Sequence, residues 1–340
     1  MAIRSRCGFD ELEGFPKDHA NEIGVVPPVV ITGAGSPCGK LFVENDALGP
    51  KYRGALLHVD PGPRLLRAYF PNEDGASYRV RIENVLVNEQ DTYFRPIDAA
   101  FGPDGTLYIC DWYDGGVGGH AYNDPNRGRV YSLRTTSSAV EGHPNPPPYR
   151  TIAQALRGLA SPNLDAQFVA REHLLRNSQS SSPALAAVMK KGDPVVAARA
   201  AWTLDRLGHE ARDPILRLLN SKKANERSLA VRILRRHGES YFRSMVQHVN
   251  DPSASVRREL LLAVRDRETE EADRALVTLA EQWDGTDRFY LEAIGIAARG
   301  QSGQALDRFK KFRGTYDDLH LRDTRRMEML FKKLVEDPAN

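Results

Sequence analysis

The spacing of hydrophobic residues changes near residue 150, and this change constrains the fold more than any other feature of the sequence. Before that point, short apolar and aromatic runs are bounded by Gly, Pro, Asp and Asn, a pattern typical of strands joined by turns. After it, Ala, Leu, Arg and Glu recur with the spacing of amphipathic helices. Since 340 residues suffice for about two domains of roughly 150 residues each, we expect a β part followed by an α-helical part.

The first part is predicted to be antiparallel and all-β, because no helix-length periodic segment separates its short runs. We expect strands at about 28–32, 38–44, 54–60, 64–70, 78–86, 96–102, 106–111 and 128–134. Residues 42–69 and 99–131 share one layout, in which a strand ending in Asp60 or Asp111 precedes a short strand with an aromatic residue. Consecutive blades of a β-propeller have this layout, so residues 1–136 are predicted to form about two blades of one.

The second part is predicted to be an α-solenoid of short HEAT-like repeats over residues 151–335. Positions 167, 199, 227, 257 and 288 align at intervals of about 30 residues, and all but the first are arginines. We expect this arginine to bond to carboxylates or helix ends of the neighbouring repeat; the alternative is a ridge of arginines that binds a ligand. Asp-Pro at 193–194 and 251–252 is predicted to begin a helix, with Asp as the N-cap. The Pro-rich residues 137–150 are expected to be a stiff linker.

Charge and cysteine content exclude several classes of protein. Lys and Arg number 47 against 45 Asp and Glu, and this balance argues against a nucleic-acid protein that depends on a strong positive field. No apolar run approaches the roughly 18 residues of a membrane-spanning helix, and no signal peptide is visible at the start. The cysteines Cys7, Cys38 and Cys110 form no CxxC pair, which excludes a zinc ribbon and a c-type haem motif in this sequence.

Cys38 has two interpretations. A nearby Lys40 would lower the pKa of its thiol and make it reactive, whereas a buried cysteine would be inert. A disulfide between Cys38 and Cys110 is also open, because both lie in neighbouring predicted blades.

Six segments of the sequence resemble a known family. They are Gly33–Gly39, Tyr52–Asp60, Arg95–Asp98, Pro103–Gly105, Leu107–Tyr113 and Arg127–Tyr131. With them the chain resembles a bacterial family of membrane-bound dehydrogenase-like proteins, also described as PVC-type haem-binding or sorbosone-dehydrogenase-like. The resemblance implies a six-bladed propeller, similar to that of quinoprotein sugar dehydrogenases, followed by HEAT repeats and often by a cytochrome c domain. It covers most of residues 1–300 and is most specific at 95–131.

The resemblance implies candidate site residues around the long loop 112–127, which should share one rim with Arg95. Carboxylate oxygens suit a Ca²⁺ ion, arginines can pair with the carboxylates of pyrroloquinoline quinone, an indole can stack on a flat ring and a histidine can act as general base. The candidates are Asp98, Asp111 and Asp114 as metal ligands, Arg95, Trp112 and Arg127 for the cofactor, and His120 as catalytic base. The alternative is structural: the aspartates cap strand ends, the aromatic side chains pack between blades and His120 is solvated.

Two functions follow as hypotheses. About two blades are expected where a closed propeller needs at least four, so the first hypothesis is a fragment of an exported dehydrogenase-family protein that oxidises a sugar, alcohol or aldehyde. Its periplasmic location and a cytochrome c electron acceptor are implied by the resemblance alone. The fragment itself is expected not to catalyse, because most of the active site would lie in other blades. The alternative is a non-catalytic scaffold that binds a protein partner through its solenoid.

Overall fold

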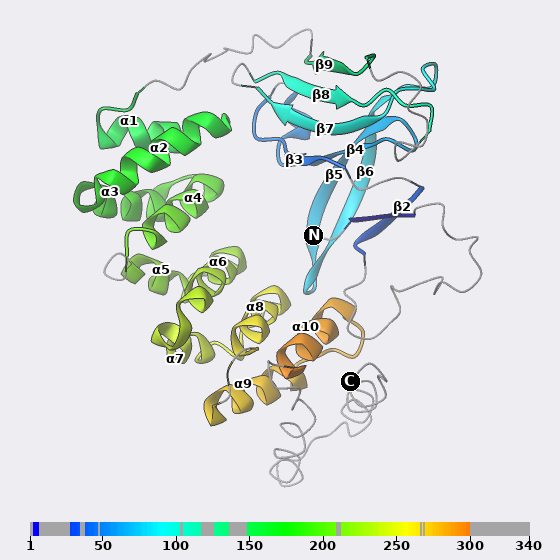
Figure 1. Ribbon diagram of the computed structural model, residues 1–340. Helices are drawn as coiled ribbons and strands as arrows, with labels where there is room; N and C mark the ends of the chain where they lie inside the picture. The colour runs from blue at the N-terminus through cyan, green and yellow to red at the C-terminus, as the bar shows by residue number, and fades with distance from the viewer. Residues whose placement is uncertain are drawn as a thin grey trace. The chain divides into compact units, whose positions relative to one another are not determined.

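The computed structural model describes residues 3–6, 28–34, 38–46, 48–102, 105–116, 126–135, 148–208, 212–265, 267 and 269–299. The chain divides into two compact units. Unit 1 comprises Met1–Phe15, Pro28–Asn72 and Arg79–Leu207, and unit 2 comprises Pro16–Pro27, Glu73–Tyr78 and Gly208–Asn340. Strands precede helices along the chain (Figure 1), which confirms the predicted mixture of β and α parts.

The predicted strands are present within a residue or a few of their expected bounds. Strands β3 (Lys40–Phe42), β4 (Leu56–Asp60), β5 (Leu65–Asp74) and β6 (Ser77–Val87) form a four-stranded sheet in sequence order. Strands β7 (Pro96–Phe101), β8 (Leu107–Asp111) and β9 (Arg129–Leu133) form a three-stranded antiparallel sheet. A further pair, β1 (Ile3–Arg6) and β2 (Val30–Ala34), is parallel, which corrects the expectation of an all-antiparallel part.

The core of these two sheets lies between them. Along β8 the side chains alternate, so that Leu107 and Ile109 are buried while Tyr108 and Cys110 are exposed. Leu107 and Ile109 belong to one hydrophobic cluster with Leu57 of β4. The period of two along the strand therefore determines which side of β8 packs on the four-stranded sheet. The four-stranded sheet has the strand number of a propeller blade, whereas the sheet of β7, β8 and β9 has one strand fewer among the described residues, and a propeller stays a prediction.

Helices follow the strands, and several begin where the sequence predicts. Their bounds are α1 Ile152–Leu159, α2 Leu164–Arg176, α3 Ser178–Lys191, α4 Pro194–Asp205, α5 Asp213–Leu218, α6 Ala224–Leu234, α7 Phe242–Val246, α8 Ala254–Val264, α9 Glu270–Glu281 and α10 Arg288–Arg299. Asp193 caps α4 as predicted, since its carboxylate accepts from the Val195 amide at 2.9 Å. None of the described helices is long and apolar enough to cross a membrane.

The same prediction for Asp251 is wrong. Helix α8 begins at Ala254, with Ser253 at the N-cap position. The Asp251 carboxylate instead binds the guanidinium of Arg227 at 2.6 and 2.8 Å. Its Oδ1 also accepts from the Ser253 amide at 2.8 Å, so Asp251 joins the arginine of the preceding repeat to the turn before α8 and is not the N-cap of that helix.

The recurring position makes contacts between repeats, as predicted. In unit 2, Arg227 of α6 reaches Asp251 immediately before α8, and both side chains are nearly buried. In unit 1, Arg199 of α4 donates to the Leu159 carbonyl at the end of α1, at 3.0 Å. Gln167 occupies this position in α2. Successive helices of unit 2, namely α6, α8 and α10, contact one another, so the arginines stabilise a stack of repeats.

Candidate functional site

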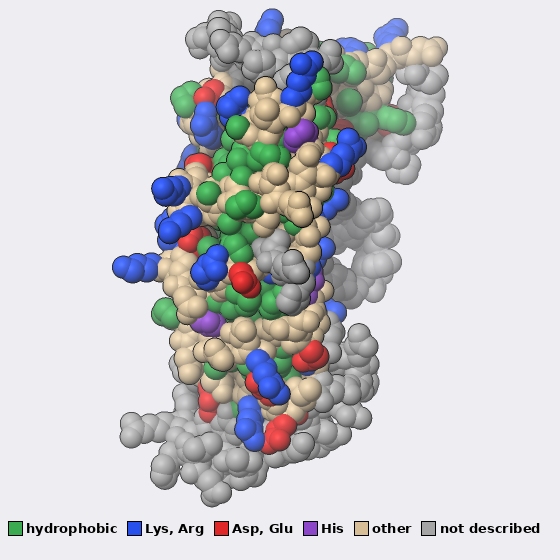
Figure 2. Space-filling model, turned by 90° about the vertical axis from the view of Figure 1, so that its left-hand side faces the viewer, with side chains coloured by type: hydrophobic (Ala, Val, Ile, Leu, Met, Phe, Trp, Pro, Cys, Tyr) green, Lys and Arg blue, Asp and Glu red, His purple; other side chains and the backbone are tan. Residues whose placement is uncertain are grey.

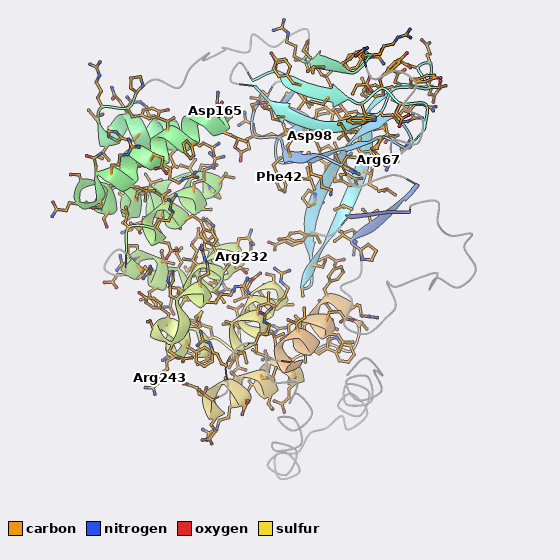
Figure 3. All side chains as sticks on the ribbon, in the orientation of Figure 1. Phe42, Arg67, Asp98, Asp165, Arg232 and Arg243 are labelled. Atoms are coloured by element: carbon orange, nitrogen blue, oxygen red, sulfur yellow. The ribbon has the colours of Figure 1, made fainter. Side chains whose placement is uncertain are left out.

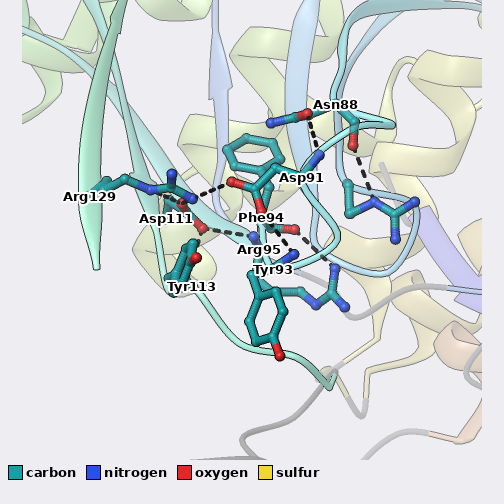
Figure 4. Close-up of polar contacts among 9 residues, drawn as sticks. Asn88, Asp91, Tyr93, Phe94, Arg95, Asp111, Tyr113 and Arg129 are labelled. Atoms are coloured by element: carbon teal, nitrogen blue, oxygen red, sulfur yellow. Dashed lines mark hydrogen bonds and ion pairs between the residues drawn. The ribbon is translucent and has the colours of Figure 1, made fainter. Parts of the chain in front are cut away.

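The residues at the end of β8 form a polar network around the buried carboxylate of Asp111 (Figure 4). Its Oδ1 accepts from the backbone amides of Arg95 at 2.7 Å and Tyr113 at 3.0 Å. Its Oδ2 accepts from Nε of Arg129 at 3.0 Å. The antiparallel register places Asp111 opposite Arg129 on β9. The carboxylate thereby joins two strands and the turns at their ends.

Arg129 is the residue of this network that sequence reasoning missed. Its Nη2 also contacts Asp91 Oδ2 at 2.7 Å, and this hydrogen bond lowers the pKa of Asp91. The guanidinium lies over the Tyr113 ring, 4.3 Å from the centroid, where a cation–π attraction adds to the ion pairs. Tyr113 has a φ of 53°, a left-handed conformation that costs energy for a residue with a side chain. The hydrogen bond from the Tyr113 backbone amide to Asp111 Oδ1 holds Tyr113 in that conformation.

Arg95 lies on the same rim as Asp111 and the start of the long loop, as predicted. Its backbone carbonyl accepts from the Trp112 amide at 2.9 Å. Its buried guanidinium donates to the carbonyls of Phe94 at 3.0 Å and Gly115 at 3.3 Å. Burial lowers the pKa of this guanidinium. The hydrogen bonds that the structure describes for the Arg95 side chain therefore go to the backbone of this turn.

The three candidate metal ligands do not gather into one site. Asp114 is buried and its Oδ1 accepts from the Gly116 amide at 3.1 Å. Asp98 is exposed and its Oδ1 accepts from its neighbour's amide, that of Ala99, at 2.9 Å. Across the residues that the structure describes, no group of three His, Cys, Asp or Glu side chains could hold a metal. The geometry matches the alternative in which these aspartates bind local amides at strand ends.

The side chains of the remaining described candidates are exposed. Trp112 is about half exposed, at 49%, and Arg127 is also exposed. His120 lies outside the described residues. Among the described residues, the printed hydrogen bonds of the candidate calcium ligands Asp98 and Asp114 go to backbone amides.

A second cluster of titratable groups lies on β4 and β5, and sequence reasoning gave it no role. His58 Nδ1 lies 3.1 Å from the Tyr69 hydroxyl, and Asp60 pairs with Arg67 at 3.0 Å. His58 and Asp60 are almost fully buried. Among the described residues, His58 Nε2 and Asp60 Oδ1 have no hydrogen-bond partner. Arg67 is labelled in Figure 3.

Burial changes the pKa of both groups in opposite directions. It lowers the pKa of His58 to about 4, with a smaller effect of Lys40 and Arg67. It raises the pKa of Asp60 to about 6, against the attraction of Arg67. Both shifts disfavour the charged form, as removal from water does. Paired shifts of this kind occur at functional sites and also in structural networks.

The same cluster corrects one interpretation of Cys38. Burial and the nearby Asp60 carboxylate raise the pKa of the Cys38 thiol, and these effects outweigh the opposite effect of Lys40. The thiol is therefore protonated at neutral pH and poorly nucleophilic. Cys38 and Cys110 are both free, so the disulfide left open by the sequence does not form.

These pKa shifts predict opposite pH dependences for two variants. In Asp60→Asn only the pKa shift of His58 remains. The His58 imidazole binds a proton near pH 6.5 in the unfolded state but only near pH 4 in the folded state. The free energy of unfolding therefore falls by about 1–2 kcal/mol between pH 7 and pH 5. In His58→Gln only the pKa shift of Asp60 remains. The Asp60 carboxylate binds a proton near pH 6 in the folded state but only near pH 3.8 in the unfolded state. The free energy of unfolding therefore rises by about 1 kcal/mol as the pH falls from 7 to 5. Urea unfolding of each variant and of the wild type at pH 7 and pH 5 measures these changes in the free energy of unfolding. Two variants with the wild-type pH profile would contradict it.

Comparisons with known proteins support the helical part of this description. A model for HEAT repeats matches residues 181–265, which confirms HEAT-like repeats over that part of the predicted range 151–335; residues 300–335 lie outside the described residues. A model described as a domain of unknown function, DUF7133, matches residues 19–135, and that description names no activity. No curated protein and no solved structure matches the chain. The dehydrogenase resemblance gains no support from these comparisons.

Proposed function

We propose that this chain is a non-catalytic scaffold that binds a protein partner through its HEAT-like helices. HEAT repeats stack into extended surfaces that commonly bind other proteins. The observation that carries the proposal is a set of exposed apolar side chains on two of these helices. Leu164 and Phe168 of α2 and Val195 of α4 are 63%, 55% and 54% exposed. Large apolar side chains gathered in water mark interaction sites.

These three side chains, here called the α2–α4 patch, lie on adjacent helix faces. Gln167 of α2 and Arg199 of α4 both donate to the Ser161 carbonyl, at 2.8 and 3.3 Å, so the faces that carry them converge. Leu164 and Val195 precede these two residues by three and four positions, which places each one turn away on the same face. In Figure 3 the label of Asp165 marks this end of α2.

The surroundings of the patch favour a partner that presents aromatic or aliphatic side chains. The Arg171 guanidinium lies 5.5 Å from the centroid of the Phe168 ring, so the patch has a basic rim. Figure 2 shows another side of the helices, where hydrophobic side chains are also exposed among Lys and Arg side chains. An apolar centre with a polar rim is the usual anatomy of a protein–protein interface.

Charged substitutions in the patch are expected to abolish partner binding without unfolding the chain. We expect Leu164→Asp/Phe168→Asp to weaken binding of the protein partner by about thirtyfold to a thousandfold, because each anchor is worth about 1–2 kcal/mol. The matched control is Val130→Asp, whose side chain is 66% exposed on β9. Calorimetric titration of the purified partner with all three chains measures the dissociation constants. Equal constants for the double variant and the wild type would overturn the proposal.

The resemblance supports a second proposal, that the chain is part of an exported dehydrogenase-like protein with a β-propeller. Two successive antiparallel sheets that share one core are compatible with neighbouring blades. The periplasmic location, the pyrroloquinoline quinone and Ca²⁺ cofactors and the cytochrome c acceptor belong to this proposal. Retention of Ca²⁺ or the quinone by the purified chain separates the two functions, because a scaffold of this kind needs neither.

A further inference from the structure

The turn between β5 and β6 is bound by two charged side chains from the helices of unit 2. The backbone amide of Ala76 donates to Asp287 Oδ2 at 2.7 Å. The carbonyl of the same residue accepts from Nη1 of Arg258 on α8. Both backbone polar groups of one residue are thus recognised, the amide by a carboxylate and the carbonyl by a guanidinium. Ion-assisted bonds of this kind are stronger than neutral ones.

This contact requires glycine ahead of the recognised residue. Gly75 has a φ of 57°, a conformation that favours glycine. A Cβ at this position would lie 2.3 Å from Asp287 Oδ2. Asp287 has little freedom to move away, because its Oδ1 also accepts from the Tyr290 amide at 3.0 Å in the first turn of α10.

Positive charge surrounds the other side of the contact. Glu259 is buried, and its Oε1 accepts from both Arg232 at 2.7 Å and Arg258 at 3.0 Å. Arg235 lies 3.8 Å from its Oε2. Three arginines therefore share one glutamate, and Arg232 is still 45% exposed. The turn that occupies this surface carries the acidic pair Glu73 and Asp74 directly before Gly75, so its charge complements that of the arginines.

We propose that Asp287, Arg258 and Arg232 form a recognition site for an acidic, glycine-containing turn of a partner protein. In this structure the chain's own turn, residues 73–78, occupies the site. The inference rests on the proposed scaffold function and names a second surface with its partner chemistry. Because the own turn is tethered, it competes at an effective concentration on the order of millimolar. A partner turn therefore binds only after the own turn has left.

A synthetic peptide tests this competition in the full chain. The probe is a dye-labelled, disulfide-cyclised peptide that carries residues 72–78, and fluorescence anisotropy measures its binding. Gly75→Ala places a Cβ against Asp287 and should vacate the site, so we expect it to bind the peptide at least about tenfold more tightly than the wild type. Gly54→Ala is the matched control: Gly54 has a φ of 80° with nothing within 4 Å of its added Cβ, and this variant should bind like the wild type.

Two further measurements identify the site. Arg232→Gln in the Gly75→Ala background should weaken binding several-fold, and so should a peptide with Gln and Asn in place of Glu73 and Asp74. In the wild type, excess peptide should accelerate hydrogen exchange of the Ala76 amide, because the displaced turn loses its bond to Asp287. This readout does not depend on the folding of any variant. Equal binding by Gly75→Ala and the wild type, together with unchanged exchange at Ala76, would overturn the inference.

The outcome is independent of the test of the α2–α4 patch. Loss of partner binding in the patch variants with no peptide binding would retain the scaffold function and remove only this site. Peptide binding that depends on Arg232, with no effect of the patch variants, would instead retain this site and remove the patch.

Discussion

Replacing Asp111 with alanine is expected to lower the free energy of unfolding of the β sheets by about 3–5 kcal/mol, the usual cost of removing one partner from a buried ion pair. The buried carboxylate accepts from two backbone amides and from Arg129. Without it, the amides of Arg95 and Tyr113 lose their acceptor and the guanidinium loses one of its two carboxylates. Urea unfolding followed by the fluorescence of the adjacent Trp112, in chains whose Trp202 and Trp283 are both replaced by Phe, measures the effect.

Asp46→Ala is the matched control for this prediction. Asp46 also pairs with an arginine, Arg53, but both side chains are more than half exposed, at 51% and 61%. An exposed pair of this kind contributes about 0–1 kcal/mol. If Asp111→Ala destabilised the chain no more than Asp46→Ala, the contacts of Asp111 with Arg95, Tyr113 and Arg129 would not stabilise the sheet.

The sequence was sufficient to predict the strands, because their signals are local. The run Leu107–Cys110 is bounded by turn residues, which is visible without a structure, whereas the alternation of buried and exposed side chains along it is seen only in the structure. The parallel strand β1 could not be predicted in this way. Its four residues, Ile3–Arg6, carry no alternation of apolar and polar side chains, and a parallel partner lies far away in the sequence.

Site residues were harder to predict because their roles depend on register. Asp111 and Arg95 were singled out as strand-end residues, and the structure brings them together. Arg129 was missed because its contact with Asp111 exists only in the register that pairs β8 with β9. The aspartates Asp98, Asp111 and Asp114 suggested a metal site, but hydrogen bonds to nearby amides use Oδ1 of each of them. Carboxylates near turns more often bind local backbone than a cation.

In the helical part, the recurrence of arginine predicted a contact between repeats but not its geometry. The Asp-Pro pair at 251–252 had the same appearance as that at 193–194, and only the latter caps a helix. The neighbouring repeat differs: Arg227 binds both oxygens of Asp251, whose Oδ1 also accepts from the Ser253 amide, whereas Arg199 donates to backbone carbonyls and to Glu44. A local motif therefore has two outcomes, and the tertiary partner determines which occurs.

The pair Arg227–Asp251 should be one of the most sensitive contacts of the solenoid. Arg227 is 11% and Asp251 3% exposed, and the arginine also donates to the Ser221 carbonyl at 2.8 Å. Arg227→Ala leaves a buried carboxylate without its counter-charge, so we expect a loss of about 3–4 kcal/mol. Arg227→Lys keeps the charge but not the bidentate geometry, and should recover only part of it. Lys223→Ala is the control, because its pair with Glu226 is largely exposed on the lysine side.

A double-mutant cycle distinguishes this pair from general damage to the helix. If the two groups interact directly, Arg227→Ala/Asp251→Ala is expected to cost less than the sum of the single variants, by about 1–3 kcal/mol. Stability in a solenoid depends on contacts between neighbouring repeats. In the wild type we therefore expect the amides of α6 and α8 to exchange with deuterium at similar rates, whereas in each single variant the two helices should exchange at different rates. Additive effects with unchanged exchange would mean that the apolar contacts between α6 and α8 hold the repeats together without the ion pair.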